Sequence, residues 1–156
     1  MSLEAIGDEN KNKHIGKLIK DTVCRCLLFI CSHGLKKSIL KQPTAWDFIV
    51  ACSKQPLSHT LVFQGVTLPT AVSTINALAS QPSKKFAAEQ KTKNFFCYCL
   101  NYKILGNMLR LLFEQKDIVA KFYDPSAFVL QQENQTKLFS FLQPLTPIPL
   151  VLKFDS

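Results

Sequence analysis

The feature that most constrains this sequence is a row of apolar residues near its start, spaced three and four positions apart. That spacing places the row on one face of a helix of about five turns. The row comprises Ile15, Leu18, Ile19, Val23, Cys26, Leu27 and Ile30. Gly34 follows where a left-handed helix cap is expected, and Leu35 can fold back as the hydrophobic contact of that cap. The sequence therefore predicts a helix that ends at His33, with Lys36 and Lys37 near the negative end of its dipole.

Capping residues and prolines mark the next elements. Thr44 followed three positions later by Asp47 matches a capping box, and Pro56 ends the helix that this box begins. The expected inner face of that helix comprises Trp46, Ile49 and Val50. The apolar stretch 61–66 fits a strand or a helix. Thr67-Leu68-Pro69 predicts a further helix start, because proline is favoured in the first turn.

The middle of the chain combines a polar stretch with a dense apolar one. Gln81-Pro82-Ser83 predicts a break, after which Ser83 caps a polar helix over 84–93. Core residues crowd the segment 94–113, and Asn101-Tyr102-Lys103 within it predicts a junction between two helices. A shorter run of apolar residues over 118–123 predicts one or two further helical turns.

The last third is divided by prolines. Asp124-Pro125 reads as a helix cap followed by proline in the first helical position. The helix expected over 134–143 carries four apolar residues, Leu138, Phe139, Phe141 and Leu142. Three prolines then exclude a regular helix. The alternating tail 150–154 is expected to pack as an extended strap.

Composition favours one helical domain. Only 5 of the 156 residues are Gly, whereas sandwiches and barrels need many tight turns. Hydrophobic residues make up 47%, which is ample for a packed core. Connections are short and no repeat is visible. We therefore expect an all-α, compact single domain of about eight helices over 14–155, preceded by a polar segment, 1–13.

The charge narrows the partner class. The net charge is +8, but the 19 cations include only two arginines, Arg25 and Arg110. Nucleic-acid readers rely heavily on the arginine fork, so nucleic acid is not an expected partner. A lysine-rich surface suits acidic proteins or anionic lipid headgroups. The plainer alternative is that these lysines only keep the fold soluble.

No targeting signal is visible. The polar N-terminus has no apolar run close behind it, as a signal peptide requires. The apolar run 26–31 is far shorter than the ~20 residues of a membrane span. We expect a cytoplasmic protein, with peripheral association with vesicles or endomembranes left open, and its six cysteines as free thiols.

Catalytic and metal-binding motifs are absent from the sequence. There is no phosphate-binding glycine loop, no nucleophile elbow and no His-Glu-x-x-His pair. Two Cys-x-Cys pairs, 24–26 and 97–99, point their thiols about 200° apart on a helix, which does not suit one zinc ion. Cys26 and Cys99 are instead expected to be small core residues. We predict no enzymatic activity, no metal and no cofactor.

An ordered series of landmarks resembles the RUN domain over residues 14–155. The series comprises His33-Gly34-Leu35-Lys36-Lys37, Trp46-Asp47-Phe48-Ile49, Phe95-Phe96-x3-Leu100-Asn101-x-Lys103-x-Leu105, Leu109-x2-Leu112, Phe122-Tyr123-x3-Ala127-Phe128 and Leu138-x2-Phe141-Leu142-x2-Leu145-x2-Ile148-Pro149-Leu150-x-Leu152. The resemblance implies about eight helices and a docking role toward small GTPases of the Rap or Rab type, or toward kinesin and other trafficking proteins. The stretch 141–145 is most similar to adaptors that pair a RUN domain with an SH3 domain. The stretch 91–96 departs from the family's Gly-Arg-x-Arg-Ala-Trp pattern, which puts the usual GTPase assignment in question.

We predict a non-enzymatic adaptor or effector module that binds its partner through basic residues. The candidate partner-binding residues are Lys36, Lys37, Lys41, Lys91, Lys93, Lys103 and Arg110. A basic face would steer encounter with the acidic switch regions of a GTPase. The alternatives are a peripheral membrane module whose lysines contact anionic lipid, and a structural module that contacts another domain of its own parent protein. Oligomeric state does not follow from the sequence.

Overall fold

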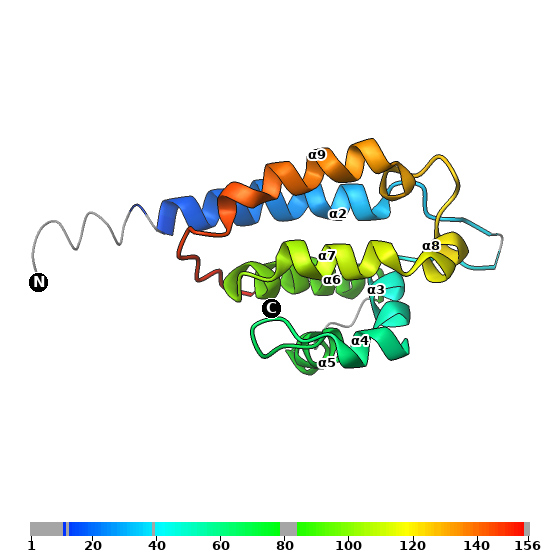
Figure 1. The fold of residues 1–156 in the computed structure, drawn as a ribbon, viewed down its shortest axis with the longest axis horizontal. Helices are drawn as coiled ribbons and strands as arrows, with labels where there is room; N and C mark the ends of the chain where they lie inside the picture. The colour runs from blue at the N-terminus through cyan, green and yellow to red at the C-terminus, as the bar shows by residue number, and fades with distance from the viewer. Residues whose placement is uncertain (1–10, 12, 39, 79–83, 155–156) are drawn as a thin grey trace, which may run out of the picture.

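The computed structural model describes residues 11, 13–38, 40–78 and 84–154, which fold almost entirely into helices (Figure 1). The α-helices are α2 (Arg25–Ser32), α3 (Ala45–Ser53), α4 (Pro56–Thr60), α5 (Leu68–Leu78), α6 (Lys84–Asn101), α7 (Leu105–Glu114), α8 (Lys116–Phe122) and α9 (Gln132–Leu142). A π-helix, η1 (Ile19–Cys24), precedes α2, and the 3₁₀ turns η2 (Phe128–Leu130) and η3 (Gln143–Leu145) flank α9. Within the described residues, β pairing is limited to two isolated bridges. The expected all-α domain of about eight helices is confirmed.

Helix α6 is the centre of the core. Residues 95–100 are all buried, so its second half is enclosed on every side. It packs against η1 and against α2, α3, α5 and α7. In Figure 1, α7 runs in front of α6, while α3, α4 and α5 cover the lower side. The junction expected at 101–103 is confirmed, because α6 ends at Asn101 and α7 begins at Leu105.

The first helix differs from the predicted stripe. Residues 13–18 are helical and lead directly into η1. Because a π turn holds one residue more than an α turn, it shifts which side chains face the core. The buried positions become Ile19, Val23, Cys24, Leu27 and Cys31. Cys26 is exposed, so its assignment to the core was wrong, and Ile15 and Leu18 are exposed as well.

The end of this helix is a tight turn. Gly34 has a φ of +77°, which confirms the predicted left-handed conformation. His33 before it is already extended (φ −69°, ψ 127°), so the helix ends at Ser32, one residue earlier than predicted. Leu35 is half-buried against the hydrophobic core and forms an antiparallel bridge with Tyr123. This bridge ties the start of the α2–α3 connection to the end of α8.

The predicted capping box is confirmed. The Asp47 backbone N–H donates to Thr44 Oγ1 at 3.2 Å, and the Thr44 N–H donates to Asp47 Oδ2 at 2.8 Å. Pro56 is the first residue of α4, as expected of a proline that follows a helix end. The ambiguous stretch 61–66 is neither strand nor helix. It is a tight turn closed by hydrogen bonds between Phe63 and Val66.

One prediction for the last third was wrong, whereas the helix expected over 134–143 is confirmed as α9. Asp124-Pro125 begins a turn, closed by a hydrogen bond from the Ala127 N–H to the Asp124 carbonyl, and starts no α-helix. In α9, Leu138 and Leu142 are buried, but Phe141 is 61% exposed, because it lies outside the inward face of that helix. The break at 79–83, including the Ser83 cap, lies outside the described residues.

The extended strap over 150–154 is confirmed. Leu150 and Leu152 are buried, while Val151 between them is 90% exposed. Asn101 fixes the strap at the end of α6. Its Nδ2 donates to the Leu152 carbonyl at 3.0 Å, and the Leu152 N–H donates to Asn101 Oδ1 at 2.6 Å. One side chain therefore satisfies both backbone groups of the middle strap residue.

Candidate partner-binding surfaces

The predicted partner-binding residues fall into three separate groups. Lys36, Lys37 and Lys41 lie in the connection between α2 and α3. Lys91 and Lys93 are half-buried on α6, and Lys103 and Arg110 line a groove beside α7. Figure 1 shows the α2–α3 connection at one end of the molecule, beyond α8, and the α6–α7 turn at the other. The structure therefore offers several local basic surfaces in place of one continuous face.

Lys36 has a structural role. Its Nζ donates to the Ala120 carbonyl at 2.7 Å, and its backbone N–H donates to the Phe122 carbonyl at 2.8 Å. Both carbonyls belong to the last turn of α8, where a cation interacts favourably with the helix dipole. Lys36 is therefore an anchor of the connection, and only Lys37 and Lys41 extend from it without such a contact.

The exposed part of the connection, which we call the basic loop, consists of Lys37, Leu40 and Lys41. Leu40 is 93% exposed, the highest value among the large apolar residues that the structure describes. In the described part of the chain, neither lysine ammonium has a hydrogen-bond or ion-pair partner. The backbone is nonetheless held, since the Lys41 N–H donates to Ser38 Oγ at 2.9 Å and Thr44 starts the capping box of α3. An exposed leucine between unpaired cations is thus presented on an anchored support.

Leu40 was not among the predicted site residues. Helical periodicity does not identify it, because it belongs to no helix. A signal was present in the sequence, since an aliphatic residue beside Lys41 in a short polar connection has no core to join.

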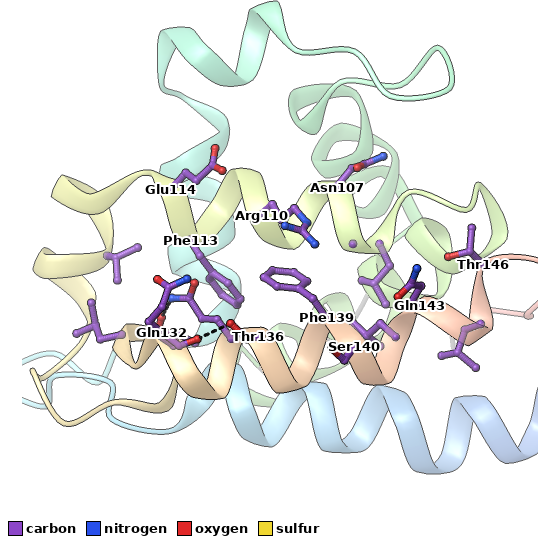
Figure 2. Close-up of a pocket in the computed structure, with 18 of the residues that line it drawn as sticks. Asn107, Arg110, Phe113, Glu114, Gln132, Thr136, Phe139, Ser140, Gln143 and Thr146 are labelled. Atoms are coloured by element: carbon purple, nitrogen blue, oxygen red, sulfur yellow. Dashed lines mark hydrogen bonds between the residues drawn. The ribbon is translucent and has the colours of Figure 1, made fainter.

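A groove of about 1000 Å³ lies between α7 and α9, and we call it the α7–α9 groove. Figure 2 shows the Arg110 side chain extending from α7 toward the Phe139 ring of α9. The Arg110 guanidinium carbon lies 4.2 Å from the centroid of that ring, a cation–π contact. Phe113 packs against the same ring with centroids 6.3 Å apart. The groove thus combines an aromatic floor with a fixed cation.

The charges along the groove are mostly positive. Lys103, Arg110 and Lys116 line it, against a single lining carboxylate, Glu114. Glu114 follows Arg110 by one helical turn, but no ion pair joins them among the described residues. In Figure 2 the Glu114 side chain points away from the Arg110 guanidinium. The cations of the groove are therefore not neutralised from within it.

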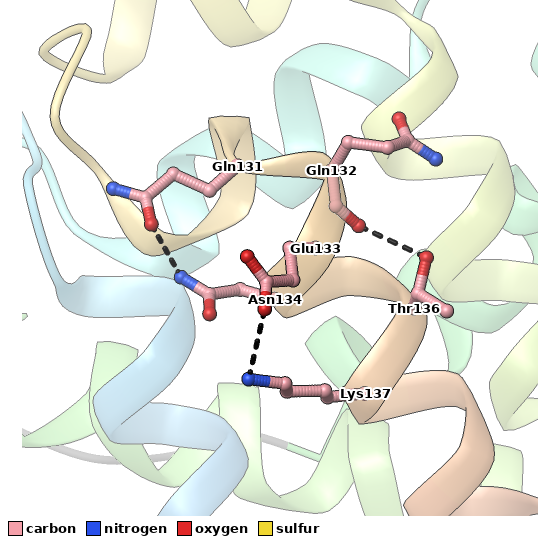
Figure 3. A network of polar contacts seen from close by, with 6 residues as sticks. All are labelled: Gln131, Gln132, Glu133, Asn134, Thr136 and Lys137. Atoms are coloured by element: carbon pink, nitrogen blue, oxygen red, sulfur yellow. Dashed lines mark hydrogen bonds and ion pairs between the residues drawn. The ribbon is translucent and has the colours of Figure 1, made fainter.

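Polar contacts hold the first turns of α9, which forms one wall of the groove (Figure 3). Asn134 Nδ2 donates to Gln131 Oε1 at 2.6 Å, and Lys137 pairs with Glu133 at 3.2 Å across one helical turn. Both ionic side chains are well exposed, so this pair stabilises the helix by only about 0.3–0.5 kcal/mol. These contacts lie outside the groove and leave its cations unpaired.

Buried thiols account for most of the cysteines. Cys24 Sγ and Cys97 Sγ lie 3.8 Å apart in the core, and Cys99 is fully buried, as predicted. Burial raises the pKa of Cys31 and of Cys52 to about 12, which keeps both thiols protonated at neutral pH. In the described residues, no group of three or more His, Cys, Asp or Glu side chains is placed to hold a metal ion.

The histidine at the helix end has a structural role. His33 Nδ1 accepts a hydrogen bond from the Phe128 N–H at 3.1 Å, which ties the end of α2 to η2. This hydrogen bond gives His33, the only His in the landmark 33–37, a structural role. A role in proton transfer is not needed to explain why a histidine is present there.

Comparison with known proteins identifies the family. None of the helices in the described residues is long and apolar enough to cross a membrane. A search of curated proteins found no match. The sequence profile of the RUN domain matches residues 22–156, which is most of the chain and contains every predicted landmark. This chain belongs to the RUN domain family.

Proposed function

We propose that this domain is an adaptor or effector module that binds a small GTPase of the Rap or Rab type, or a trafficking or motor protein, through the basic loop. RUN domains are protein-interaction modules associated with small-GTPase signalling, and they are not catalytic domains. The partner named here is more specific than the family. It is what the resemblance to RUN domains implies, and the chemistry of the exposed surface supports it.

The observation that carries the proposal is Leu40, 93% exposed beside Lys41 and close to Lys37. An aliphatic side chain in water forgoes the ~1.5–3 kcal/mol that burying it would provide. A partner that covers Leu40 recovers this free energy. Because the backbone around it is already hydrogen-bonded, little further ordering is needed on binding.

The lysines add steering to this apolar contact. Small GTPases often present acidic switch regions, and a partner of that charge is attracted over about 10 Å at moderate ionic strength. Exposed charges at the edge of an interface act mainly on the association rate. The basic loop therefore supplies a central apolar residue and flanking cations that accelerate encounter.

The test measures association of the purified domain with a panel of Rap- and Rab-type GTPases, each loaded with GDP or with a non-hydrolysable GTP analogue. The double variant Lys37→Glu, Lys41→Glu should lower the association rate about tenfold at low salt, with a smaller effect at high salt. The matched control is Lys17→Glu, Lys121→Glu, which makes the same charge change at exposed lysines outside the loop. Equal rates for the two double variants at low salt would reject the loop as the docking surface.

A second candidate function is supported by the same residues. An exposed leucine beside lysines also suits an anionic membrane surface, where each lysine contributes about 1 kcal/mol. Leu40→Ala should then reduce sedimentation with vesicles that contain phosphatidylserine, in the absence of any protein. If the domain stays in the supernatant with such vesicles, this candidate is excluded and the protein-partner proposal is unaffected.

A further inference from the structure

We propose that the α7–α9 groove is a second binding site, which takes an extended peptide segment of a partner protein bearing an aspartate or glutamate next to an apolar residue. The carboxylate of that segment would pair with Arg110, and the apolar side chain would lie against Phe139. This site is separate from the basic loop, because none of Lys37, Leu40 and Lys41 lines the groove. It goes beyond the proposed function by giving the module two partners.

The geometry of Arg110 is what selects a carboxylate. Its guanidinium carbon lies over the Phe139 ring, 4.2 Å from the ring centroid, so the ring holds the cation in place within the groove. The five N–H donors of a guanidinium lie in its plane and point outward from the edge. A cation held in this way is pre-oriented for two parallel hydrogen bonds to one carboxylate. No hydrogen bond or ion pair to another described residue occupies those donors.

The charge of the groove complements such a ligand along its length. Lys103 precedes α7 and Lys116 follows it, so cations stand near both ends of the groove as well as at its centre. Glu114 is the only lining carboxylate among the described residues, and it points away from Arg110 (Figure 2). An acidic segment therefore meets attraction along most of the groove, and a basic one meets repulsion.

The shape of the groove favours an extended segment over a compact small molecule. Lining residues follow the whole of α7, whose 10 residues rise about 15 Å. An extended chain of about five residues spans the same length. Helix α9 and the turn η3 after it offer neutral polar groups to a peptide backbone, from Gln132, Ser140 and Gln143. Phe139 and Phe113 supply the apolar contact.

The experiment selects ligands from a random hexapeptide phage library on the immobilised intact chain, then measures the affinity of the selected peptides as fluorescent synthetic probes. We expect enrichment of Asp or Glu next to an apolar residue. Arg110→Glu should weaken binding at least tenfold, and Arg110→Lys should weaken it less, because lysine keeps the charge but not the fork. Phe139→Leu, which keeps an apolar side chain but removes the ring, should also weaken binding.

Arg25→Glu is the matched control, since Arg25 is the other arginine of the chain and lies exposed on α2. Its affinity for the peptides should equal that of the native chain. Circular dichroism and the unfolding midpoint of each variant show whether it is folded. Failure to select acidic peptides, or equal binding by the Arg110→Glu and Arg25→Glu variants, would overturn the proposal.

Two further measurements distinguish a peptide site in the groove from a lipid site and from the basic loop. If Arg110→Glu abolishes sedimentation with phosphatidylserine vesicles and leaves peptide binding intact, the groove holds a lipid headgroup and the peptide proposal is wrong. The Arg110→Glu variant should retain GTPase association at the basic loop. Loss of peptide binding with retained GTPase binding supports two sites, whereas parallel loss of both would show that they are one.

Discussion

Replacement of Gly34 by alanine tests the turn that joins the first helix to the rest of the domain. Gly34 has a φ of +77°, where an L-residue is disfavoured by about 1–2 kcal/mol. A Cβ at this position would lie 2.4 Å from the Ala127 Cβ and 2.7 Å from the Ala127 Cα. Real Cβ atoms do not approach other atoms so closely, and the nearest atoms belong to a short side chain and backbone that have little room to move.

The loss of stability expected for Gly34→Ala has two parts, a conformational cost and a steric one. Forcing a methyl group into such a contact adds about 1–3 kcal/mol to the conformational cost. The sum is about 2–5 kcal/mol, a large share of the 5–15 kcal/mol that stabilises a typical domain. For a chain of 156 residues, the unfolding temperature falls by about 2–4 °C for each kcal/mol.

Two other glycines serve as controls in urea unfolding. Gly65 has a φ of +78°, but a Cβ there meets nothing within 4 Å, so Gly65→Ala should cost only about 1–2 kcal/mol. Gly106 lies in α7 with open space around it, and Gly106→Ala should be neutral or stabilise by up to about 1 kcal/mol. If Gly34→Ala costs no more than Gly65→Ala, the close approach of the turn to Ala127 does not exist in solution.

Three further predictions concern the strap and the thiols. Asn101→Ala should destabilise the domain by about 1–3 kcal/mol and speed hydrogen exchange of the strap amides. The control is Asn107→Ala, at an exposed position, which should change neither stability nor exchange. Unaltered exchange in the Asn101→Ala variant would contradict the two hydrogen bonds that Asn101 makes to the strap. At pH 8 the native chain should show one fast-alkylating thiol, Cys26, by mass spectrometry, and fast labelling of several would refute the burial described. Because burial raises the pKa of Cys31 and Cys52 to about 12 from 9.0, the unfolded state ionises first, so stability should decline between about pH 9 and 12.

Local structure could be predicted from the sequence where neighbouring residues determine it. The capping box of Thr44 and Asp47, the left-handed Gly34 and the alternating strap over 150–154 each depend on a few adjacent positions, and each is confirmed. The order of such landmarks also identified the family. These features need no knowledge of distant contacts.

Features set by distant contacts were missed. The π turn at Ile19–Cys24 moves Cys26 from the expected core face to the surface, and no local signal marks it. The sequence does not show that Lys36 is anchored, because the Ala120 carbonyl that it binds lies 84 residues away. The pairing of Arg110 with Phe139 likewise depends on how α7 and α9 pack. Charge marked Arg110 as a candidate, but only the fold shows the groove around it.

The most direct test of partner docking at the basic loop places a photo-crosslinking residue, p-benzoylphenylalanine, in that loop. The substitution at position 40 should capture the bound GTPase or trafficking protein on illumination. The same residue at position 62 is the control, because Val62 is also an exposed aliphatic residue, 57% exposed, in a different connection. We predict an abundant crosslink from position 40 and none from position 62. A crosslink from position 62 with none from position 40 would show that the partner binds a different face.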